Sequence, residues 1–363
     1  MNIDFFGSSL VSSYWNGAAT YYRGLLRALA GLGHQITFYE PDAFERQAHR
    51  DMPDPHWARI TVYPATPTGW QQALANARCN ADLLVKASGV GIFDAELDAA
   101  IPDARRNGAM AVYWDVDAPA TLDAIESDPQ HRLRHLIPHY DAVLTYGGHA
   151  PVVEGYRRWG ARACVPVYNA LDPDTHYPVA PEDAFHCDLS FLGNRLPDRE
   201  ARVEEFFLKP AARSATRTFL LGGAGWEGKS IPPNVTAHGH VGTSDHNAFY
   251  CSALATLNIN RESMARYGFS PPTRIFEAAG ASACVISDAW EGIDLFLEPG
   301  EEILVAKDGE AVADLLKGLT VRGAREIGCK ARLRMLAEHT YAHRAIQVTR
   351  FLDLMARHRE AAA

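Results

Sequence analysis

Arg274 and Glu277 are the pair of residues whose types and spacing best suit chemistry on a ligand. On a helix, side chains three positions apart lie on the same face. Ser270 is a favourable N-cap and Pro271 suits the first helical position, so we expect a helix to begin there. A helix N-terminus stabilises a diphosphate, and an arginine in the first turn adds to that effect. The pattern fits an anion site with a carboxylate for sugar hydroxyls. An ordinary capped amphipathic helix with an exposed ion pair fits it equally well.

Two aspartates, Asp115 and Asp117, follow the predicted strand Ala111–Trp114 in the string DVDAP. A carboxylate at a strand end can serve as a general base when it faces a cleft. Asp115 lies closer to the strand end, so it is the first candidate and Asp117 the second. Asp117 could equally cap the helix that Pro119 begins. The D-x-D spelling also occurs in metal sites of proteins with another fold, and no metal ligand is predicted here.

Small and basic residues follow two other predicted strands. The loop after the first strand is small and polar up to Gly17, which could let a ligand approach the backbone and the next helix closely. A plain strand-to-helix connection fits that loop equally well. The loop GNRLPDRE begins with Gly193 and Asn194, which suit a tight turn. Its Arg195 and Arg199 could reach a diphosphate, although one of them is expected only to pair with acids of the following helix.

Two glycine-containing loops of the second half carry further candidates. In HGHVGTSDHNAFY, Val241 would present backbone groups to the edge of a base, and His240 could stack or hydrogen bond there. An ordinary loop histidine is the alternative for His240. The string GGAGWEG formally matches the dinucleotide fingerprint, but Pro232 and Pro233 follow where that motif needs a helix. We interpret it as a glycine-rich turn.

The elements that must position these residues are short apolar runs that alternate with helical patterns such as Ala18–Leu32 and Val152–Trp159. This alternation is typical of parallel sheets covered by helices. The predicted strands are Ile3–Phe6, Ile36–Tyr39, Ile60–Tyr63, Leu83–Lys86, Ala111–Trp114, Ala142–Thr145 and Ala163–Val167, then Leu189–Leu192, Thr218–Leu221, Val235–Ala237, Leu254–Ile259, Cys284–Ser287 and Ile303–Val305. They predict an α/β protein with two doubly wound halves. In such sheets a ligand binds beyond the carboxyl ends of the strands, where the loops described above lie.

The length of the chain predicts two domains. Its 363 residues exceed the roughly 250 to 300 at which a single core stops growing. Asn169–Asp183 contains three prolines and no periodicity, so it is the expected linker. We therefore expect Rossmann-like domains at 1–170 and 184–340, followed by a helix at 341–363.

Composition restricts the classes of function. The formal net charge is −9, which argues against a surface that holds nucleic acid or anionic lipid. Six widely spaced cysteines form no CxxC pair and predict neither a zinc site nor a disulfide framework, which fits a reducing cytoplasm. The string MNIDFFGSSL lacks the pattern of a signal peptide, and no run nears the roughly 18 apolar residues of a membrane span. We expect a cytoplasmic protein.

Several strings, taken together and in order, are similar to one known family. They are SFLGNRLPDR (190–199), NVTAHGHV (234–241), NIN followed by RIFEAAGASACVISD (258–288), FLEPGEEILVAKDGE (296–310) and HTYAHRA (339–345), with YWDVDAP (113–119) and LTYGG (144–148) in the first half. The chain resembles the CgeB-like, or spore-maturation-protein-type, glycosyltransferases.

The resemblance implies a GT-B architecture, in which two Rossmann-like domains face each other across a cleft and the C-terminal helix crosses back to the first. It implies that a nucleotide-sugar donor binds mainly to the second domain and the acceptor to the first. Such enzymes need no metal, because a helix N-terminus and basic side chains neutralise the leaving diphosphate. Glu277 matches the glutamate that they use on the ribose hydroxyls. Phe269 stands where many retaining relatives have a second glutamate that contacts the donor sugar, so the stereochemistry is not carried over.

The leading hypothesis is a metal-independent glycosyltransferase. It would move a sugar from a nucleoside diphosphate sugar, a UDP- or dTDP-sugar, to a hydroxyl or amine of a small-molecule, glycan or protein acceptor. Pro272, Thr273, Arg274 and Glu277 would hold the diphosphate and ribose together with Arg195. The alternatives are a GT-B-type nucleotide-sugar epimerase or hydrolase, a non-catalytic nucleotide-sugar binding protein and, more distantly, a dinucleotide oxidoreductase. The sequence leaves open whether the protein forms a homodimer.

Overall fold

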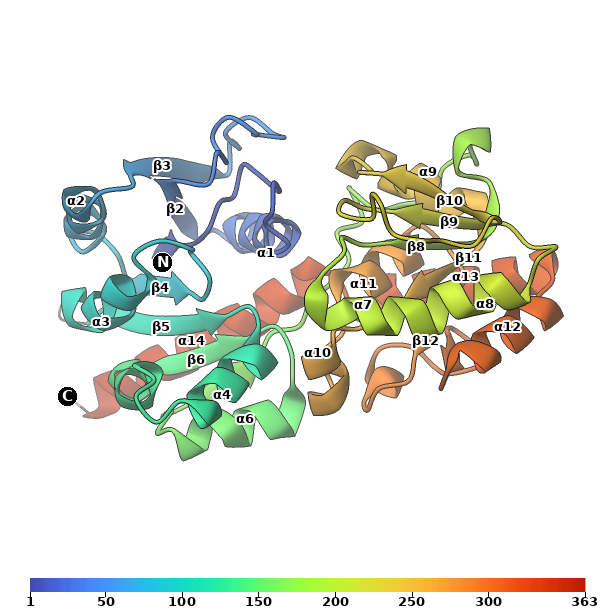
Figure 1. The fold of residues 1–363 in the computed structure, drawn as a ribbon. Coiled ribbons are helices and arrows are strands. Elements are labelled where there is room, and N and C mark those ends of the chain that lie inside the picture. Colours follow the sequence, from blue (N-terminus) through green and yellow to red (C-terminus); the bar gives the residue numbers. More distant parts are fainter. Residues whose placement is uncertain (107, 363) are drawn as a thin grey trace. The chain divides into compact units, whose positions relative to one another are not determined.

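The computed structural model describes residues 1–106 and 108–362, and the chain divides into two compact units (Figure 1). One unit comprises Met1–Asn169 with Tyr341–Ala363, and the other comprises Ala170–Thr340. Each unit contains one parallel sheet with helices packed against it. Within the described residues, no helix is both long enough and apolar enough to span a membrane.

The first unit is built on a seven-stranded parallel sheet with the order β3-β2-β1-β4-β5-β6-β7. Its strands are β1 (Asn2–Phe6), β2 (Gln35–Asp42), β3 (Ala58–Pro64), β4 (Leu83–Ala87), β5 (Met110–Asp115), β6 (Ala142–Thr145) and β7 (Cys164–Pro166). Each of the seven predicted runs overlaps one of them. Phe5 pairs with Val85 and Val85 with Val112, and all three are buried. Central strands of a parallel sheet are covered on both faces, so they are continuously apolar in sequence.

The helices of the first unit include one from the far end of the chain. They are α1 (Ala19–Gly31), α2 (Pro67–Ala77), α3 (Asp94–Ala104), α4 (Ala118–Ser127), α5 (Leu133–Leu136), the short 3₁₀ turn η1 (Ile137–His139), α6 (His149–Arg158) and α14 (Tyr341–Ala362). The ring of Tyr341 lies edge-on to Tyr21 of α1, with 6.0 Å between centroids. His34 and Thr349 are hydrogen bonded at 2.9 Å. The C-terminal helix therefore packs on the first unit.

The second unit is built on a six-stranded parallel sheet with the order β10-β9-β8-β11-β12-β13. Its strands are β8 (Cys187–Leu192), β9 (Phe219–Gly222), β10 (Val235–Gly239), β11 (Ala253–Asn258), β12 (Val285–Asp288) and β13 (Leu304–Ala306). Its helices are α7 (Pro197–Val203), the π-helix η3 (Glu204–Leu208), α8 (Lys209–Arg213), α9 (His246–Ser252), α10 (Glu262–Tyr267), α11 (Thr273–Gly280), α12 (Gly309–Gly318) and α13 (Val321–Glu338), with 3₁₀ turns η2 (Asp183–Phe185), η4 (Thr243–Asp245) and η5 (Ile293–Leu295). Phe191, Leu257 and Ile286, on three neighbouring strands, are fully buried in its core. All six predicted strands are present.

The segment predicted to link the domains, Asn169–Asp183, packs largely on the second unit. Leu171 is buried and donates its N–H to the carbonyl of His339 at 2.7 Å. A Cβ added to Gly280 of α11 would lie 2.2 Å from Leu171 and 3.1 Å from the carbonyl oxygen of His176. The absence of a side chain at Gly280 thus lets an irregular segment lie directly against a helix.

The helix that carries Arg274 and Glu277 begins later than the sequence predicts. Its first residue is Thr273, and Pro272 occupies the N-cap position. The prediction that Ser270 caps the helix is wrong: Ser270 is buried, and its hydroxyl has no hydrogen-bond partner among the described residues. A residue that precedes proline avoids the helical conformation. This restriction applies to Ser270 and again to Pro271, so the helix cannot start before the second proline.

Candidate functional site

In the second unit, Arg274 is held at the carboxyl ends of two neighbouring strands. Its Nε donates to the carbonyl oxygen of Leu192 at the end of β8 (2.7 Å), and its Nη1 donates to Oδ1 of Asn258 at the end of β11 (2.8 Å). The guanidinium also lies over the ring of Phe191, 5.1 Å from its centroid. These contacts hold the guanidinium group at the carboxyl ends of the strands, where open α/β sheets bind their ligands.

A second arginine, Arg199, reaches the same place from α7. A Cβ added to Gly193 would lie 2.6 Å from Nη1 of Arg199 and 3.1 Å from Nη2 of Arg274. The two guanidinium groups therefore both lie where a side chain at position 193 would be. Burial and the charge of Arg274 lower the pKa of Arg199 to about 9. Its Nε has no hydrogen-bond partner among the described residues. Two adjacent, partly buried cations with donors to spare favour an anion between them.

Arg195, the other arginine of this loop, is engaged elsewhere. It forms a bidentate pair with Glu200 of α7, at 2.9 Å and 2.7 Å. Glu200 also accepts a hydrogen bond from Lys229, and these two partners lower its pKa to about 2. Arg195 is thus the arginine that pairs with an acid of the following helix. Its predicted role as a diphosphate ligand stays a prediction, and binding there would require it to leave Glu200.

The turn at Gly193 and Asn194 is shaped by the glycine-rich loop after β9. Gly193 donates to the carbonyl of Gly222 (2.9 Å), and the side chain of Asn194 accepts from the N–H of Ala224 (2.9 Å). A Cβ on Gly223, whose φ is +119°, would lie 2.3 Å from the Gly193 oxygen. The string GGAGWEG is therefore a tight turn packed against β8, and no helix follows it, in agreement with the interpretation from sequence.

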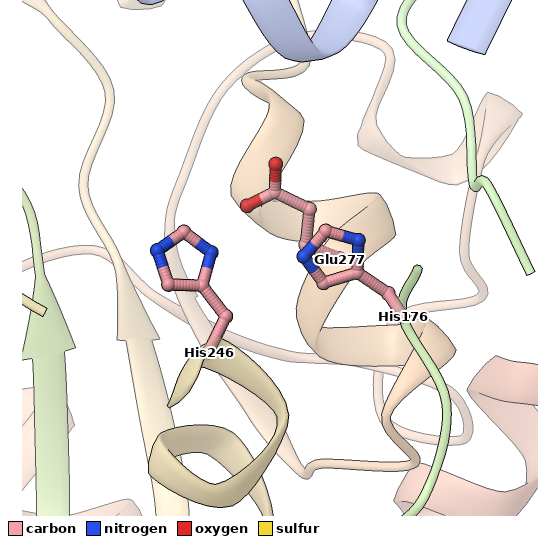
Figure 2. A group of neighbouring side chains, drawn as sticks. All are labelled: His176, His246 and Glu277. Carbon is pink, nitrogen blue, oxygen red and sulfur yellow. The ribbon is translucent and has the colours of Figure 1, made fainter. Parts of the chain in front are cut away.

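Glu277 lies one turn beyond Arg274 on α11 and is 8% exposed. Its Oε2 accepts a hydrogen bond from the hydroxyl of Tyr250 at 3.4 Å. Two histidines that sequence reasoning did not select, His176 and His246, turn their rings towards it, as Figure 2 shows. They come from the irregular segment before η2 and from the start of α9. The sequence carried no signal for this group, because its members lie on three segments far apart in the chain.

The loop after β10 borders this group through His246. Val241 is buried and its backbone forms a hydrogen bond with the His246 ring, whereas His240 is exposed. Burial lowers the pKa of His246, and the charge of Glu277 opposes that change. Val241 therefore lies near Glu277, because the His246 ring interacts with both. Its role in base recognition stays a prediction.

In the first unit, Asp115 lies at the end of β5 and is completely buried. Its Oδ1 accepts from the hydroxyls of Ser88 (2.8 Å) and Thr121 (3.1 Å) and from the N–H of Asp117 (2.9 Å), and its Oδ2 accepts from Tyr156. Burial raises the pKa of Asp115, while these hydrogen bonds lower it. A carboxylate with four donors and no access to solvent is suited to organising the loop, not to taking a proton from a substrate.

Asp117 is partly exposed at the N-cap position of α4, although its side chain makes no capping hydrogen bond. It is therefore the more accessible of the two predicted base candidates.

The loop that contains Gly17 is held in shape by hydrogen bonds from its own side chains. Asn16 is buried, accepts a hydrogen bond from Ser8 and donates to the carbonyl oxygens of Ser9 and Ser12. Gly17 is exposed with open space around it, just before α1 begins at Ala19. Gly17 is thus exposed to solvent next to a residue, Asn16, that hydrogen bonds fix in place.

Comparison with known proteins gives one partial family match and many similar folds. Residues 199–350 match a protein-family model described as glycosyl transferase-like. No curated protein matches the chain. Sucrose-phosphate synthase from Thermosynechococcus elongatus has a TM-score of 0.72 at 15% identity, covering 100% of both chains. HepE from Anabaena, in complex with UDP and glucose, has a TM-score of 0.70 at 14% identity, covering 97% of this chain and 99% of its own.

A third solved structure, T4 phage BGT in complex with its UDP-glucose substrate, has a TM-score of 0.62 at 11% identity and covers 98% of this chain and 99% of its own. At such identities the likeness establishes the fold. The chain consists of two Rossmann-like α/β domains with the fold of the GT-B glycosyltransferases, and its residues 199–350 match the glycosyl transferase-like family.

Proposed function

We propose that the protein is a metal-independent glycosyltransferase of the CgeB-like type, which moves a sugar from a nucleoside diphosphate sugar to an acceptor hydroxyl or amine. The observation that carries this proposal is a pair of guanidinium groups, Arg199 and Arg274, which both lie where a side chain at Gly193 would be. Arg274 stands in the first turn of α11. The family match over residues 199–350, which includes both arginines, supports it.

The arginine pair would stabilise the charge that develops on the leaving diphosphate. Arg274 is already oriented by the Leu192 carbonyl and Asn258, so little reorganisation is needed when the charge appears. Arg199 keeps unused donors close to Arg274, and a diphosphate would relieve the repulsion between the two cations. Because this charge is larger in the transition state than in the bound donor, the pair would act mainly on kcat.

Glu277 would accept hydrogen bonds from the ribose hydroxyls, one helical turn from the arginine that holds the diphosphate. Uracil is the base that we propose, since UDP or UDP-glucose is bound in two of the solved structures with this fold. A UDP-sugar is therefore the donor to test first.

Asp117 becomes our first candidate for the base that activates the acceptor, because Asp115 is buried and its oxygens are occupied. The donor sugar would meet Phe269 instead of a second glutamate. The Phe269 backbone has a φ of +47°, and its ring fills the space that a side chain at Gly292 would need. The anomeric configuration of the product, followed by NMR, will assign the reaction as inverting or retaining.

The decisive test compares UDP binding by wild type, Arg274→Ala, Glu277→Ala and Arg195→Ala in the presence of a chelator. Loss of a charged hydrogen-bond partner should weaken binding by roughly 10- to 100-fold in the first two variants. Arg195→Ala is the matched control, because that arginine is paired with Glu200, and its affinity should stay close to wild type. Unchanged affinity for UDP in both Arg274→Ala and Glu277→Ala would overturn the assignment.

A further inference from the structure

His176, His246 and Glu277 bring three potential metal ligands to one place in the second unit. One donor atom from each residue lies within 4.8 Å of the other two. Figure 2 shows the two rings and the carboxylate turned towards a common space from three separate segments. Such convergence of side chains from distant parts of the chain is a property of the tertiary structure alone.

The two imidazoles carry buried nitrogens that the protein leaves unsatisfied. His176 is 2% exposed, and its Nε2 has no hydrogen-bond partner among the described residues. The same holds for Nδ1 of His246. A buried polar atom without a partner destabilises the folded protein unless a ligand satisfies it. Two such atoms beside one carboxylate indicate that the group is built to hold something.

The neighbours of His176 favour the tautomer in which Nδ1 carries the proton. The hydroxyl of Thr175 donates to the carbonyl oxygen of Asp172 at 3.1 Å. With its hydrogen directed to Asp172, the same hydroxyl oxygen, 3.0 Å from Nδ1 of His176, accepts a hydrogen bond from the imidazole. Nε2 is left with a lone pair that faces the other two side chains. An oriented imidazole whose second nitrogen is held by a hydrogen bond is typical of metal-binding histidines.

We propose that His176 Nε2, His246 Nδ1 and the Glu277 carboxylate bind a divalent transition metal ion, with Zn²⁺ as the best fit. Two imidazoles and a carboxylate suit Zn²⁺, whereas Mg²⁺ and Ca²⁺ prefer oxygen ligands throughout. Ligands on one tetrahedral Zn²⁺ lie roughly 3.4 Å apart, given metal–ligand distances of about 2.1 Å. Small rotations of the three side chains would close the group around the ion and leave a fourth position for water.

The site has a consequence that rests on the proposed function. Glu277 is also the residue that we propose for the ribose hydroxyls. A metal ion and the ribose would both need its carboxylate oxygens, so they cannot use them at the same time. Metal and nucleotide should therefore compete. The ion would inhibit an enzyme whose chemistry needs no metal.

The test of the metal site uses Co²⁺ and Zn²⁺ alone, without nucleotide. Metal-free wild-type protein should bind one equivalent of Co²⁺ with the visible absorption of a four-coordinate ion, and Zn²⁺ should displace it. His246→Ala and His176→Gln should each weaken binding at least tenfold. His186→Ala removes an exposed histidine of the same unit and should bind as wild type does. Wild-type affinity in both His246→Ala and His176→Gln, or no stoichiometric binding by the wild type, would overturn the proposal.

Competition is tested separately, by titrating UDP into metal-free protein and into protein saturated with Zn²⁺. Zn²⁺ also binds diphosphates in solution, so the same titrations on His246→Ala give the baseline. A Zn²⁺-dependent loss of UDP affinity beyond that baseline supports competition, and no loss beyond it overturns competition. Failure of UDP to bind metal-free wild type would overturn the proposed function, while the Co²⁺ titration still decides the metal site.

Discussion

Gly193 shows how much a single residue decides in this protein. Because it has no side chain, Arg199 and Arg274 can both approach the backbone at the end of β8. A side chain at this position would occupy the volume that the two guanidinium groups take up. The candidate anion site is thus defined by an absent side chain as much as by the charges around it.

At the residue scale, we predict that the two aspartates after β5 differ in what they support. Asp115→Asn replaces an acceptor of four hydrogen bonds with a group that also carries donors, so it should destabilise the protein by about 1–3 kcal/mol. Asp117→Asn should keep wild-type stability but lose most transferase activity. Urea unfolding and product formation by both variants check this. Full stability of Asp115→Asn would contradict it.

Asp4 gives a prediction for the pH dependence of stability. Burial raises its pKa from 3.8 to about 6, against a hydrogen bond from Thr37 that lowers it. The native carboxyl takes up a proton more readily than the unfolded one. Its stabilising contribution is therefore complete below pH 3.8 and is lost as the pH rises through about 6.

Asp4→Asn should remove that loss and be more stable than wild type at neutral pH, by about 1–2 kcal/mol. The free energy of unfolding, measured in urea from about pH 4 to about pH 8, reports it. Asp42→Asn, at an exposed position on β2, is the control. The same pH slope in Asp4→Asn as in wild type would show that Asp4 is not the group responsible.

At the scale of elements, helices in this chain depend on contacts that their own sequences do not describe. α1 is amphipathic by pattern, but the close approach of α14 is possible only because position 24 is a glycine. A Cβ there would lie 2.1 Å from Cδ2 of Tyr341. The start of α11, by contrast, is set locally, because two prolines delay a helix whose apolar face is obvious in the sequence.

We expect Gly24→Ala to destabilise the first unit, although alanine is the better helix former by roughly 1 kcal/mol. The buried Tyr341 ring packs against Tyr21 and cannot easily move away, so overpacking should cost about 1–3 kcal/mol net. Gly31→Ala, at the open end of the same helix, is the control and should be neutral or stabilising. Thermal unfolding distinguishes the two. A Gly24→Ala variant more stable than wild type would contradict the packing of α14 on α1.

At the scale of the whole molecule, one unit is formed by a single stretch of chain and the other by two. The second unit is one continuous stretch, Ala170–Thr340, whereas the first needs both Met1–Asn169 and the C-terminal helix. Each unit has its own sheet and its own buried core. All residues that we propose for the donor lie in the continuous unit.

Residues 170–340 expressed alone should therefore fold and bind UDP. Residues 1–169 alone should be less stable than the same residues joined by a flexible linker to 341–363, because the surface that α14 covers would be exposed. Circular dichroism, thermal unfolding and UDP titration of the three fragments test this. Equal stability of 1–169 with and without the C-terminal helix would refute the dependence.

The sequence by itself determined the two sheets. All thirteen predicted strands are present, because strands buried on both faces must be apolar throughout, and that requirement is local. It also singled out Arg199, Arg274 and Glu277, which lie on helices that follow strand ends. The tertiary structure alone decided which side chains act together: that Arg195 pairs with Glu200 while Arg199 joins Arg274, that Asp115 is sealed in the core, and that His176 and His246 converge on Glu277. A local pattern reports whether a position is buried, but the partner it meets there depends on how distant segments pack.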